Sequence, residues 1–501
     1  MKQERYTELK TRLAEIQDLR AAGHILGWDE QVMMPPRGAG IRGEQLATIE
    51  RIAHEKFTSD EIGRLLDELQ GESEELPYDS DEASLVRVTR RDWEKARRVP
   101  PELRAEITRA ASNALPVWIE ARKASDFSQF QPALQRNLDL VHRYVECFEP
   151  ADEPYDVLLD DYEQGMTTAE VRAVFDELKR ELPLLISAIQ EQGAVDDSFM
   201  SGPFDVEAQR EFSLRVIERF GFDKEAWRLD PTVHPFMTGG GVDDIRITTR
   251  YSESDLTSLF SAMHETGHGL YEYGVARELD RTPLGSGVSL GLHESQSRMW
   301  ENLVGRSRPF WRFFYPQLQE AFPVLGEVDE EAFYRAVNKV QPSLIRVDAD
   351  EVTYNMHIIL RFELEQEMLS GAVPLRDLPE AWNARMKEYL GIDVPDDANG
   401  VLQDIHWSGG SLGYFSTYSL GNVISLQIWE QARSAMPDLL DGIEAGEFGA
   451  LREWLGDNLY RHGRKYTPKE TLERIVGGPI DPGPYVRYLN EKLGNLSGVG
   501  A

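Results

Sequence analysis

The sequence predicts a mainly helical fold with one small β element, and three observations support this. Long stretches place apolar residues at three- and four-residue steps, which is the period of an amphipathic helix. Pro-rich turns at Pro35-Pro36 and Pro100-Pro101 separate such stretches. Strict alternation is confined to one short run, Ile245 to Thr249. The 501 residues show no internal repeat and no disordered linker, so we expect one α-rich unit over 1–501, with two lobes around a groove.

Amphipathic patterns rich in Ala, Leu, Glu and Arg predict six helices in the first 192 residues. These are 1–25, 40–70, 80–98, 101–124, 127–148 and 168–192. A looser region, 194–250, follows, and its alternating run is expected to form one strand of a small sheet near the candidate site. Helices resume at 255 and dominate to about 390. The stretch 393–423 is rich in Gly and Ser, and helices return after it.

Composition is typical of a globular protein without a membrane span, since 41% of residues are hydrophobic, 28% are charged and no apolar run reaches 18 residues. The charged stretch from Met1 to Gln17 lacks the apolar segment of a signal peptide, which argues against secretion. Cys147 is the single cysteine, so no intramolecular disulfide can form. We therefore expect a cytoplasmic protein.

The formal net charge is -33, and the acidic residues are spread along the chain. Such a surface repels phosphate backbones, which argues against nucleic acid as a partner. Only 12 of the 54 basic residues are Lys. A high acid content with few Lys favours a halophilic protein, because salt screens the self-repulsion of the surface. An ordinary acidic enzyme from a genome rich in G and C would share this composition.

The most informative motif is His264-Glu265-Thr266-Gly267-His268, which reads HExxH. Apolar residues from Leu256 to Tyr271 recur at helical steps around it, and two His four residues apart share one face of a helix. Both imidazoles can therefore reach one ion, and zinc accepts imidazole nitrogen readily. Glu265 can act as a general base on a water molecule at that ion. Ser252 and Asp255 predict a capping box before the helix, and Gly274 predicts its end.

A third metal ligand must come from elsewhere in the chain. The metzincin pattern requires Gly at 271 and His at 274, and the chain has Tyr271 and Gly274 instead. The remaining choice is a carboxylate from nearby sequence: Glu272, Glu278, Asp280, Glu294 or Glu301. Glu294 is the best placed, early in an apparent second helix, and His293 is the main rival.

Several further motifs occur in a characteristic order. They are Leu26-Gly27-Trp28-Asp29 with Met34-Pro35-Pro36, His234-Pro235-Phe236, Asp244-Ile245-Arg246-Ile247-Thr248, the HExxH motif, His293-Glu294-Ser295-Gln296, Ile345-Arg346-Val347-Asp348-Ala349-Asp350 and Gly400-Val401-Leu402-Gln403-Asp404-Ile405-His406-Trp407. In this ordered set the chain resembles the carboxypeptidase Taq family of thermostable metallocarboxypeptidases.

The resemblance implies a large helical metallopeptidase fold with a deep central groove, and a homodimer. It implies that single residues are removed from the C-termini of peptides, with broad preference. It also implies His264, His268 and Glu294 as metal ligands, with Glu294 preferred over His293, and Glu265 as the catalytic carboxylate. Zinc is the expected metal, and cobalt can replace it in such sites.

An exopeptidase must also recognise a free carboxylate, which a guanidinium binds with two hydrogen bonds. Arg346 is the first candidate because the family places its motif in the groove, and Arg246 is the second. The structural alternative for each is an ion pair, with Asp348 or Asp350 for Arg346 and with Asp244 for Arg246.

The tetrahedral oxyanion needs a donor beside the metal, and the candidates are Tyr414, Tyr418 and His406. Packing of aromatic rings in a tight loop would explain the same two Tyr. Five residues are candidates for orienting the ligands or the water, namely His234, Asp244, His293, Gln403 and Asp404.

Two other functions fit parts of the pattern. An oligoendopeptidase or a dipeptidyl carboxypeptidase on a similar helical scaffold would share the site chemistry. A non-catalytic binding protein would have no need of Glu265 and three presumed ligands.

Overall fold

The computed structural model describes residues 3–191 and 193–497, with side chains described as far as 494. Residues 1, 2 and 192, at the ends of two predicted helices, lie outside the described residues. The architecture is mainly helical with one small sheet, as the sequence predicts. Among the described residues, no helix combines the length and apolar character that crossing a membrane requires.

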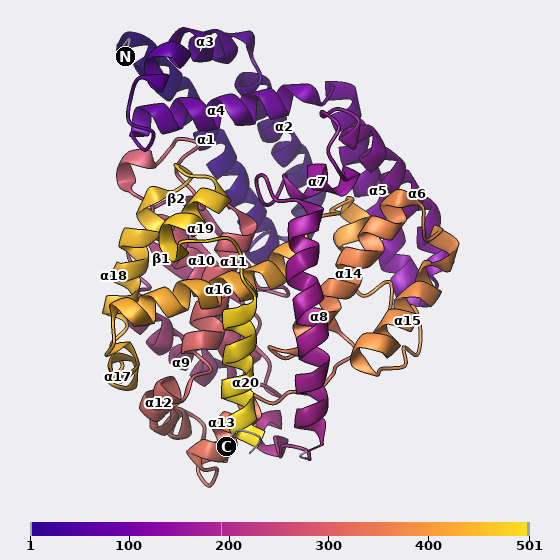
Figure 1. Cartoon of the computed structure of the whole chain (residues 1–501), viewed down its shortest axis with the longest axis vertical. Coiled ribbons are helices and arrows are strands. Elements are labelled where there is room, and N and C mark those ends of the chain that lie inside the picture. The colour runs from indigo at the N-terminus through magenta and orange to yellow at the C-terminus, as the bar shows by residue number, and fades with distance from the viewer. Residues whose placement is uncertain (1–2, 192, 498–501) are drawn as a thin grey trace.

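The first four helices lie together at the top of Figure 1. They are α1 (Gln3–Val32), α2 (Ala39–Phe57), α3 (Asp60–Glu74) and α4 (Asp81–Arg98). Their facing apolar residues, such as Leu9, Leu13 and Leu65, form a hydrophobic cluster distinct from the main core. The single helix predicted over 40–70 is wrong in one respect: it divides into α2 and α3, because Ser59 adopts an extended conformation between them.

The next helices are α5 (Pro101–Ala124), α6 (Phe127–Val145), α7 (Pro154–Leu159), α8 (Thr168–Gln190) and α9 (Val206–Phe220). Helix α9 lies inside the region 194–250 that the sequence pattern described as loose. The side chain of Asp205 caps its first turn, and one face buries Phe212, Val216 and Ile217. The description of the whole region as loose is therefore wrong for these 15 residues, which form a capped amphipathic helix.

The sheet has three strands, β1 (Trp227–Pro231), β2 (Met237–Gly241) and β3 (Asp244–Thr249), in the order β1-β3-β2. Strand β3 contains the predicted alternating run and pairs parallel with β1 and antiparallel with β2. It packs against α10, and β2 packs against α1. The sheet therefore joins the N-terminal helices to the helix that carries HExxH.

The helices that follow the sheet begin with α10 and α11, which lie near the middle of the molecule in Figure 1. The helical segments after the sheet are α10 (Thr257–Tyr273), α11 (Leu290–Arg298), the π-helix η4 (Met299–Val304), α12 (Arg308–Ala321), α13 (Glu330–Val337), α14 (Thr353–Ser370), α15 (Leu378–Leu390), α16 (Ser416–Ala435), α17 (Leu439–Glu444), α18 (Gly449–Asn458), α19 (Pro468–Val476) and α20 (Gly483–Ser497). The stretch 393–423 is loop as far as Phe415, apart from the 3-10 turn η8 (His406–Gly409). Helix α16 begins at Ser416, so helices return earlier than predicted.

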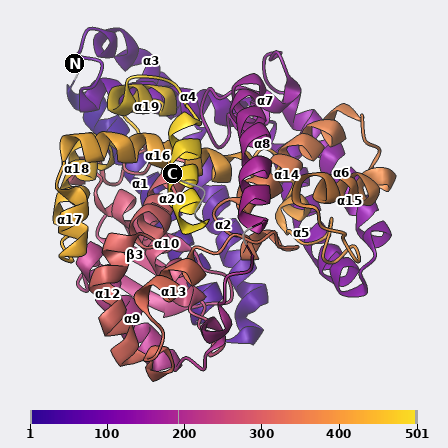
Figure 2. The same ribbon diagram turned by 60° about the horizontal axis from the view of Figure 1, so that its bottom comes forward.

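Figures 1 and 2 show two groups of helices on either side of the molecule. Helices α5, α6, α14 and α15 gather on one side, and α9, α10, α12, α17 and α18 gather on the other. Helices α8 and α20 run side by side between them, and α16 packs against α11, α14 and α20. One continuous apolar core, with Trp300 and Trp311 fully buried, connects the two groups.

Candidate metal centre and catalytic cavity

The HExxH motif lies in α10, which ends at Tyr273 as Gly274 predicts. The predicted capping box is wrong. Helix α10 begins at Thr257, and Asp255 instead accepts a hydrogen bond from the backbone N–H of Thr257, at 2.9 Å. Ser252 likewise accepts from the backbone N–H of Ser254, at 3.2 Å. The segment before the helix thus forms short turns whose side chains bond only two residues ahead.

Two glycines bring the helices around the motif unusually close. A Cβ at Gly267 would lie 2.5 Å from the backbone oxygen of Gln296 on α11. A Cβ at Gly421 on α16 would lie 2.5 Å from Cγ of Glu294. Distances this short are not tolerated by heavy atoms, so only glycine permits the approach. Helix α11 is therefore packed directly against α10 on one side and against α16 on another, at the level of the candidate ligands.

Three side chains converge in the way a metal site requires. Nε2 of His264 lies 3.6 Å and Nε2 of His268 lies 3.4 Å from Oε2 of Glu294. The three candidate ligand atoms lie within 4.8 Å of one another. Ligands at about 2.0–2.1 Å from a tetrahedral zinc are separated by about 3.3–3.4 Å, so the donor set fits a divalent metal.

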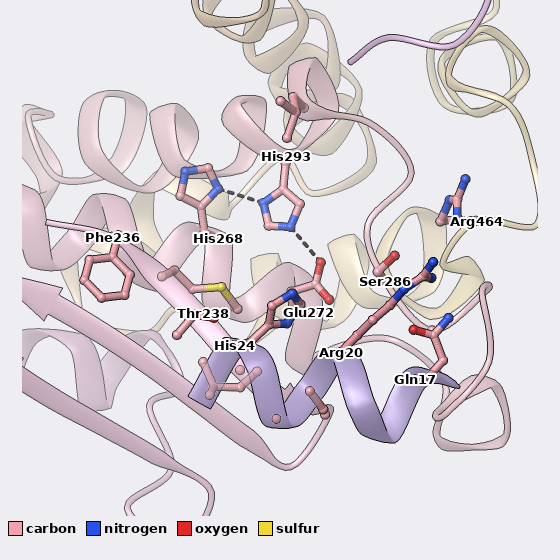
Figure 3. A pocket seen from close by; sticks show the side chains of 18 of the residues that line it. Gln17, Arg20, His24, Phe236, Thr238, His268, Glu272, Ser286, His293 and Arg464 are labelled. Carbon is pink, nitrogen blue, oxygen red and sulfur yellow. Dashed lines mark hydrogen bonds and ion pairs between the residues drawn. The ribbon is translucent and has the colours of Figure 1, made fainter. Parts of the chain in front are cut away.

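A second set of side chains holds these ligands from behind. Nδ1 of His264 is 2.9 Å from Oε2 of Glu301. Nδ1 of His268 is 2.7 Å from Nδ1 of His293, whose Nε2 is 2.7 Å from Oε1 of Glu272, as the dashed lines in Figure 3 show. Glu301 and the rival ligand His293 thus contact the two His on the side opposite to Glu294, and Glu272 in turn holds His293.

Glu294 itself is anchored within its own helix. Nε of Arg298, one turn later, donates to Oε1 of Glu294 at 2.7 Å and leaves Oε2 facing the two His. Arg298 also lies 3.3 Å from Glu301, which belongs to the π-helix η4. The widened turn is marked by the bond from Gly305 N–H to the carbonyl of Trp300. Single π turns of this kind are frequent at functional sites.

The surroundings shift the pKa values of the buried carboxyl groups of the site in opposite directions. Burial raises the pKa of Glu265 to about 7, and the neighbouring Glu294 adds to this effect. Burial acts in the same sense on Glu294, but Arg298 and the two His outweigh it and hold its pKa far below the usual range. Burial lowers the pKa of His268 to about 4. The carboxylate of Glu294 is thus charged beside the neutral imidazole of His268. At His264 burial acts in the same direction, but the carboxylates of Glu294 and Glu301 outweigh it and raise its pKa.

These groups open into a cavity of about 720 Å³. Its wall includes His264, Glu265, His268, Glu294 and residues of α1, β2 and the loop 280–286. Only 6% of Glu265 is exposed, and that surface faces the cavity. The cavity is large enough for several residues of an extended peptide.

The three predicted oxyanion donors differ in whether they reach the cavity. Tyr414, just before α16, and Tyr418, in its first turn, both line the cavity. His406 is outside its lining and lies behind Tyr418, with Nε2 at 3.4 Å from the Tyr418 hydroxyl. Burial lowers the pKa of His406 to about 4, so this imidazole is neutral near pH 7.

The two predicted carboxylate anchors already hold acidic partners. Arg346 is buried and donates to Asp404 through Nε and Nη2, at 3.0 and 2.8 Å, rather than to Asp348 or Asp350. Its other terminal nitrogen donates to the hydroxyl of Tyr354. Arg246 pairs with Asp244, at 2.9 Å, as the structural alternative predicts. Neither arginine is part of the cavity wall.

The remaining predicted residues lie around these pairs. Gln403 accepts from the backbone N–H of Arg346, and Asp404 also binds Arg361, so the motif 400–407 holds a buried cluster of charges. His234 is exposed and lies outside the cavity wall, although its neighbours Pro235 and Phe236 belong to it. Asp244 contacts Arg246 and lies at the start of β3.

Sequence reasoning missed Arg298 altogether, and it weighed Glu272 and Glu301 only as possible ligands. The i, i+4 spacing of Glu294 and Arg298 was the available signal for the first. It also missed α1 as a wall of the cavity, because no local pattern indicates which helix covers a site.

A mainly helical scaffold in which HExxH and a glutamate from the next helix converge at the base of a cavity defines a metal-dependent peptidase. A family model described as carboxypeptidase Taq (M32) metallopeptidase matches residues 8–493. The chain therefore belongs to the carboxypeptidase Taq (M32) family, and it is a metallocarboxypeptidase, a hydrolase of peptides.

Named relatives match this chain over nearly its whole length. Thermostable carboxypeptidase 1 of Thermus thermophilus is 42% identical over 491 residues, covering 96% of each chain. Thermostable carboxypeptidase 1 of Pyrococcus furiosus is 38% identical, covering 97% of this chain and 98% of that one. The crystal structure of the M32 carboxypeptidase from Deinococcus radiodurans superposes with a TM-score of 0.96 at 42% identity, covering 99% of this chain and 100% of that one.

Proposed function

We propose that this metallocarboxypeptidase releases single amino acids from the C-termini of peptides, with broad side-chain preference. We further propose that zinc, replaceable by cobalt, is held by His264, His268 and Glu294. The convergence of their Nε2 and Oε2 atoms within 4.8 Å at the base of the cavity is the observation that carries the proposal. When bound there, a divalent metal would lower the pKa of a water molecule and polarise the scissile carbonyl.

The proposed general base is Glu265. Its carboxylate accepts a proton from the attacking water and later gives it to the leaving amine. Burial supports both transfers, because a pKa raised to about 7 lets the group take up and release a proton near neutral pH. The hydroxyls of Tyr414 and Tyr418 in the cavity wall are the proposed donors to the oxyanion, and His406 supports Tyr418 from behind.

The residues behind the ligands would fix the protonation of the imidazoles. With Nε2 of His268 facing the ion, its Nδ1–H donates to Nδ1 of His293, and the Nε2–H of His293 donates to Glu272. With Nε2 of His264 facing the ion, its Nδ1–H donates to Glu301. We propose that both chains orient the rings and raise the affinity for metal. Asp244 and His234 remain proposed supports at the β3 side of the cavity.

Arg346 remains the proposed anchor for the terminal carboxylate, with Arg246 second. Two of the five N–H groups of Arg346 are not used by Asp404 or Tyr354. Its guanidinium lies 5.2 Å from the ring centre of Tyr418, which lines the cavity. Direct contact with substrate therefore requires Tyr418 to move aside. Gln403 and Asp404 would hold the guanidinium in place.

We also propose that the chain acts as one unit over its full length, as a homodimer, in a salt-rich cytoplasm. The family match over residues 8–493 supports the single unit. The net charge of -33 and the 12 Lys among 54 basic residues support the adaptation to salt.

The test is mass spectrometry of a short peptide incubated with zinc-loaded protein in high salt. Glu265→Gln and the same peptide amidated at its C-terminus are the controls. A ladder of single C-terminal losses, absent from both controls, supports the proposal. Internal cuts or released dipeptides would instead establish an oligoendopeptidase or dipeptidyl carboxypeptidase.

A further inference from the structure

Two turns of α1 form a wall of the catalytic cavity and carry an arginine. Gln17, Arg20 and His24 follow one another at three- and four-residue steps, so they share one face of the helix, and all three line the cavity. Figure 3 shows Gln17 and Arg20 at one end with Ser286 and Arg464, and His268 at the other. His293 and Glu272 lie between the two ends.

The three arginines that line the cavity differ in their partners. Arg281 donates to both carboxylate oxygens of Asp18. Arg464 donates to both oxygens of Asp92 and to the carbonyl of Pro283. Arg20, in contrast, makes no hydrogen bond and no ion pair with any residue the structure describes. Its guanidinium stacks over the ring of Phe57, with 5.2 Å to the ring centre.

The lack of a partner is unusual for an arginine in the surroundings of Arg20. Burial lowers its pKa, and nearby Arg464 acts in the same direction, while Glu50 and Asp92 oppose both. None of these acids lies within ion-pair distance of Arg20. Since guanidinium stays protonated in proteins, the group is a half-buried positive charge with free N–H donors. Unpaired charged donors of this kind are costly until an acceptor reaches them.

We propose that Arg20 binds a carboxylate group of the peptide substrate at the end of the catalytic cavity away from the metal ligands. This inference rests on the proposed peptidase function. Gln17 and Ser286 add an amide and a hydroxyl in the same wall, which suit the remaining lone pairs of a carboxylate.

Carboxylate is the chemistry that a peptide offers to such a site. Peptides carry it in two places, the side chains of Asp and Glu and the C-terminal group. The site then favours peptides with an acidic residue at one position, or it contributes to recognition of every free C-terminus. Each source predicts a different response to changes in the peptide.

The experiment measures binding by isothermal titration calorimetry, with zinc-loaded full-length Glu265→Gln as the background so that peptides are not consumed. The probes are alanine-based hexapeptides with one Glu moved through the chain, their Gln counterparts, and the same peptides amidated. Arg20→Gln removes the charge, and Arg20→Lys keeps it without the fork of donors. Arg180→Gln, in an exposed pair with Glu181, is the matched control for net charge.

With an acidic side chain as the source, one Glu peptide should bind about tenfold more tightly than its Gln counterpart. Arg20→Gln should reduce that ratio to about 1, Arg20→Lys should retain part of it, and Arg180→Gln should leave it unchanged. With the terminal carboxylate as the source, the same variants should change the ratio between free acid and amide.

An Arg20→Gln protein that keeps both ratios would overturn the inference. Cleavage of the same peptides by the enzyme with Glu265 intact is followed in parallel. Complete absence of cleavage would count against the proposed function, whereas normal cleavage with unchanged ratios would count only against the role of Arg20. Circular dichroism and zinc content of each variant show that fold and metal centre are retained.

Discussion

The two ends of the catalytic cavity differ in how their polar groups are satisfied. At the metal end each candidate ligand has a protein partner on the side opposite to the ion, such as Glu301 for His264 and Arg298 for Glu294. At the α1 end Arg20 has no such partner among the described residues. A site for one fixed ion gains from rigid ligands, whereas a site for varied peptides gains from donors left open.

The largest expected effect is the loss of activity on changing Glu265. In our proposal this carboxyl, unlike the others at the metal end, is left without a fixed partner. Glu265→Gln keeps the shape and removes the base, so kcat should fall by about 10²–10⁴-fold. Zinc content, measured by atomic absorption, should stay at that of the unchanged enzyme because the ligands are intact. Activity close to the original would show that another group takes the proton.

The next effect compares two buried carboxyl groups, Glu294 on α11 and Glu163 packed against the start of that helix. Glu294 faces cations, whereas Glu163 accepts only from the Ser289 hydroxyl and the Gly291 N–H, and burial raises its pKa to about 7. Below about pH 4.5 the carboxyl is protonated in folded and unfolded chains alike. Between about pH 4.5 and 7 only the folded protein keeps the proton, so this contribution to stability falls as pH rises.

Glu163→Gln mimics the protonated group and should remove this dependence. The free energy of unfolding of the variant, from urea titrations at pH 5 and 8, should decline less between the two values, by roughly 3 kcal/mol. Glu365, whose pKa burial also raises to about 7, stays in both proteins and cancels in the comparison. Identical pH profiles would show that Glu163 is charged in the folded protein.

A smaller effect should separate the partners of the two His ligands. Glu301→Gln weakens the contact to His264, and Glu272→Gln weakens the contact to His268 through His293. Zinc affinity, from competition with a chelator, should fall by about 10–100-fold for Glu301→Gln and by less for Glu272→Gln, which acts through one more ring. Glu278→Gln, an exposed residue of the same region, should leave the affinity unchanged.

The smallest effect uses salt to distinguish the two ends. The Debye length shortens from about 10 Å at 0.1 M to about 3 Å at 1 M salt, so a half-exposed charge is screened more than buried ligands. The preference for the favoured Glu peptide should therefore fall to about threefold at 1 M salt. Zinc affinity, measured in the same buffers, should change much less. Equal loss at both ends would contradict the difference in burial.

Local pattern was enough to predict the helix of His264 and His268, its end at Gly274, and the strand beside it. The helix of Glu294 was predicted for the same reason, because the apolar residues Met299, Trp300 and Leu303 continue its pattern. The structure adds the Ser289 cap at its start. The ordered motifs predicted the family, which the comparisons confirm. These features depend on residues that lie close together along the chain.

The predictions that failed concern contacts between residues that lie far apart in the sequence. The partner of Arg346 is Asp404, 58 residues away, so proximity suggested the wrong acids. The approach of α16 through Gly421, and of α1 through Arg20, leaves no trace in the periodicity of either helix. The proposed roles of Glu272 and Glu301 depend on which nitrogen of each imidazole faces Glu294, and spacing along the chain does not give this.

The π-helix that carries Glu301 has one further consequence. A π turn contains one more residue than an α turn, and each residue of an α-helix advances the side chains by about 100°. Deleting Trp300 would restore the ordinary turn and rotate Glu301 away from His264, without changing any of the proposed metal ligands. A change in the length of this segment would therefore weaken the proposed metal centre even with every proposed ligand left in place.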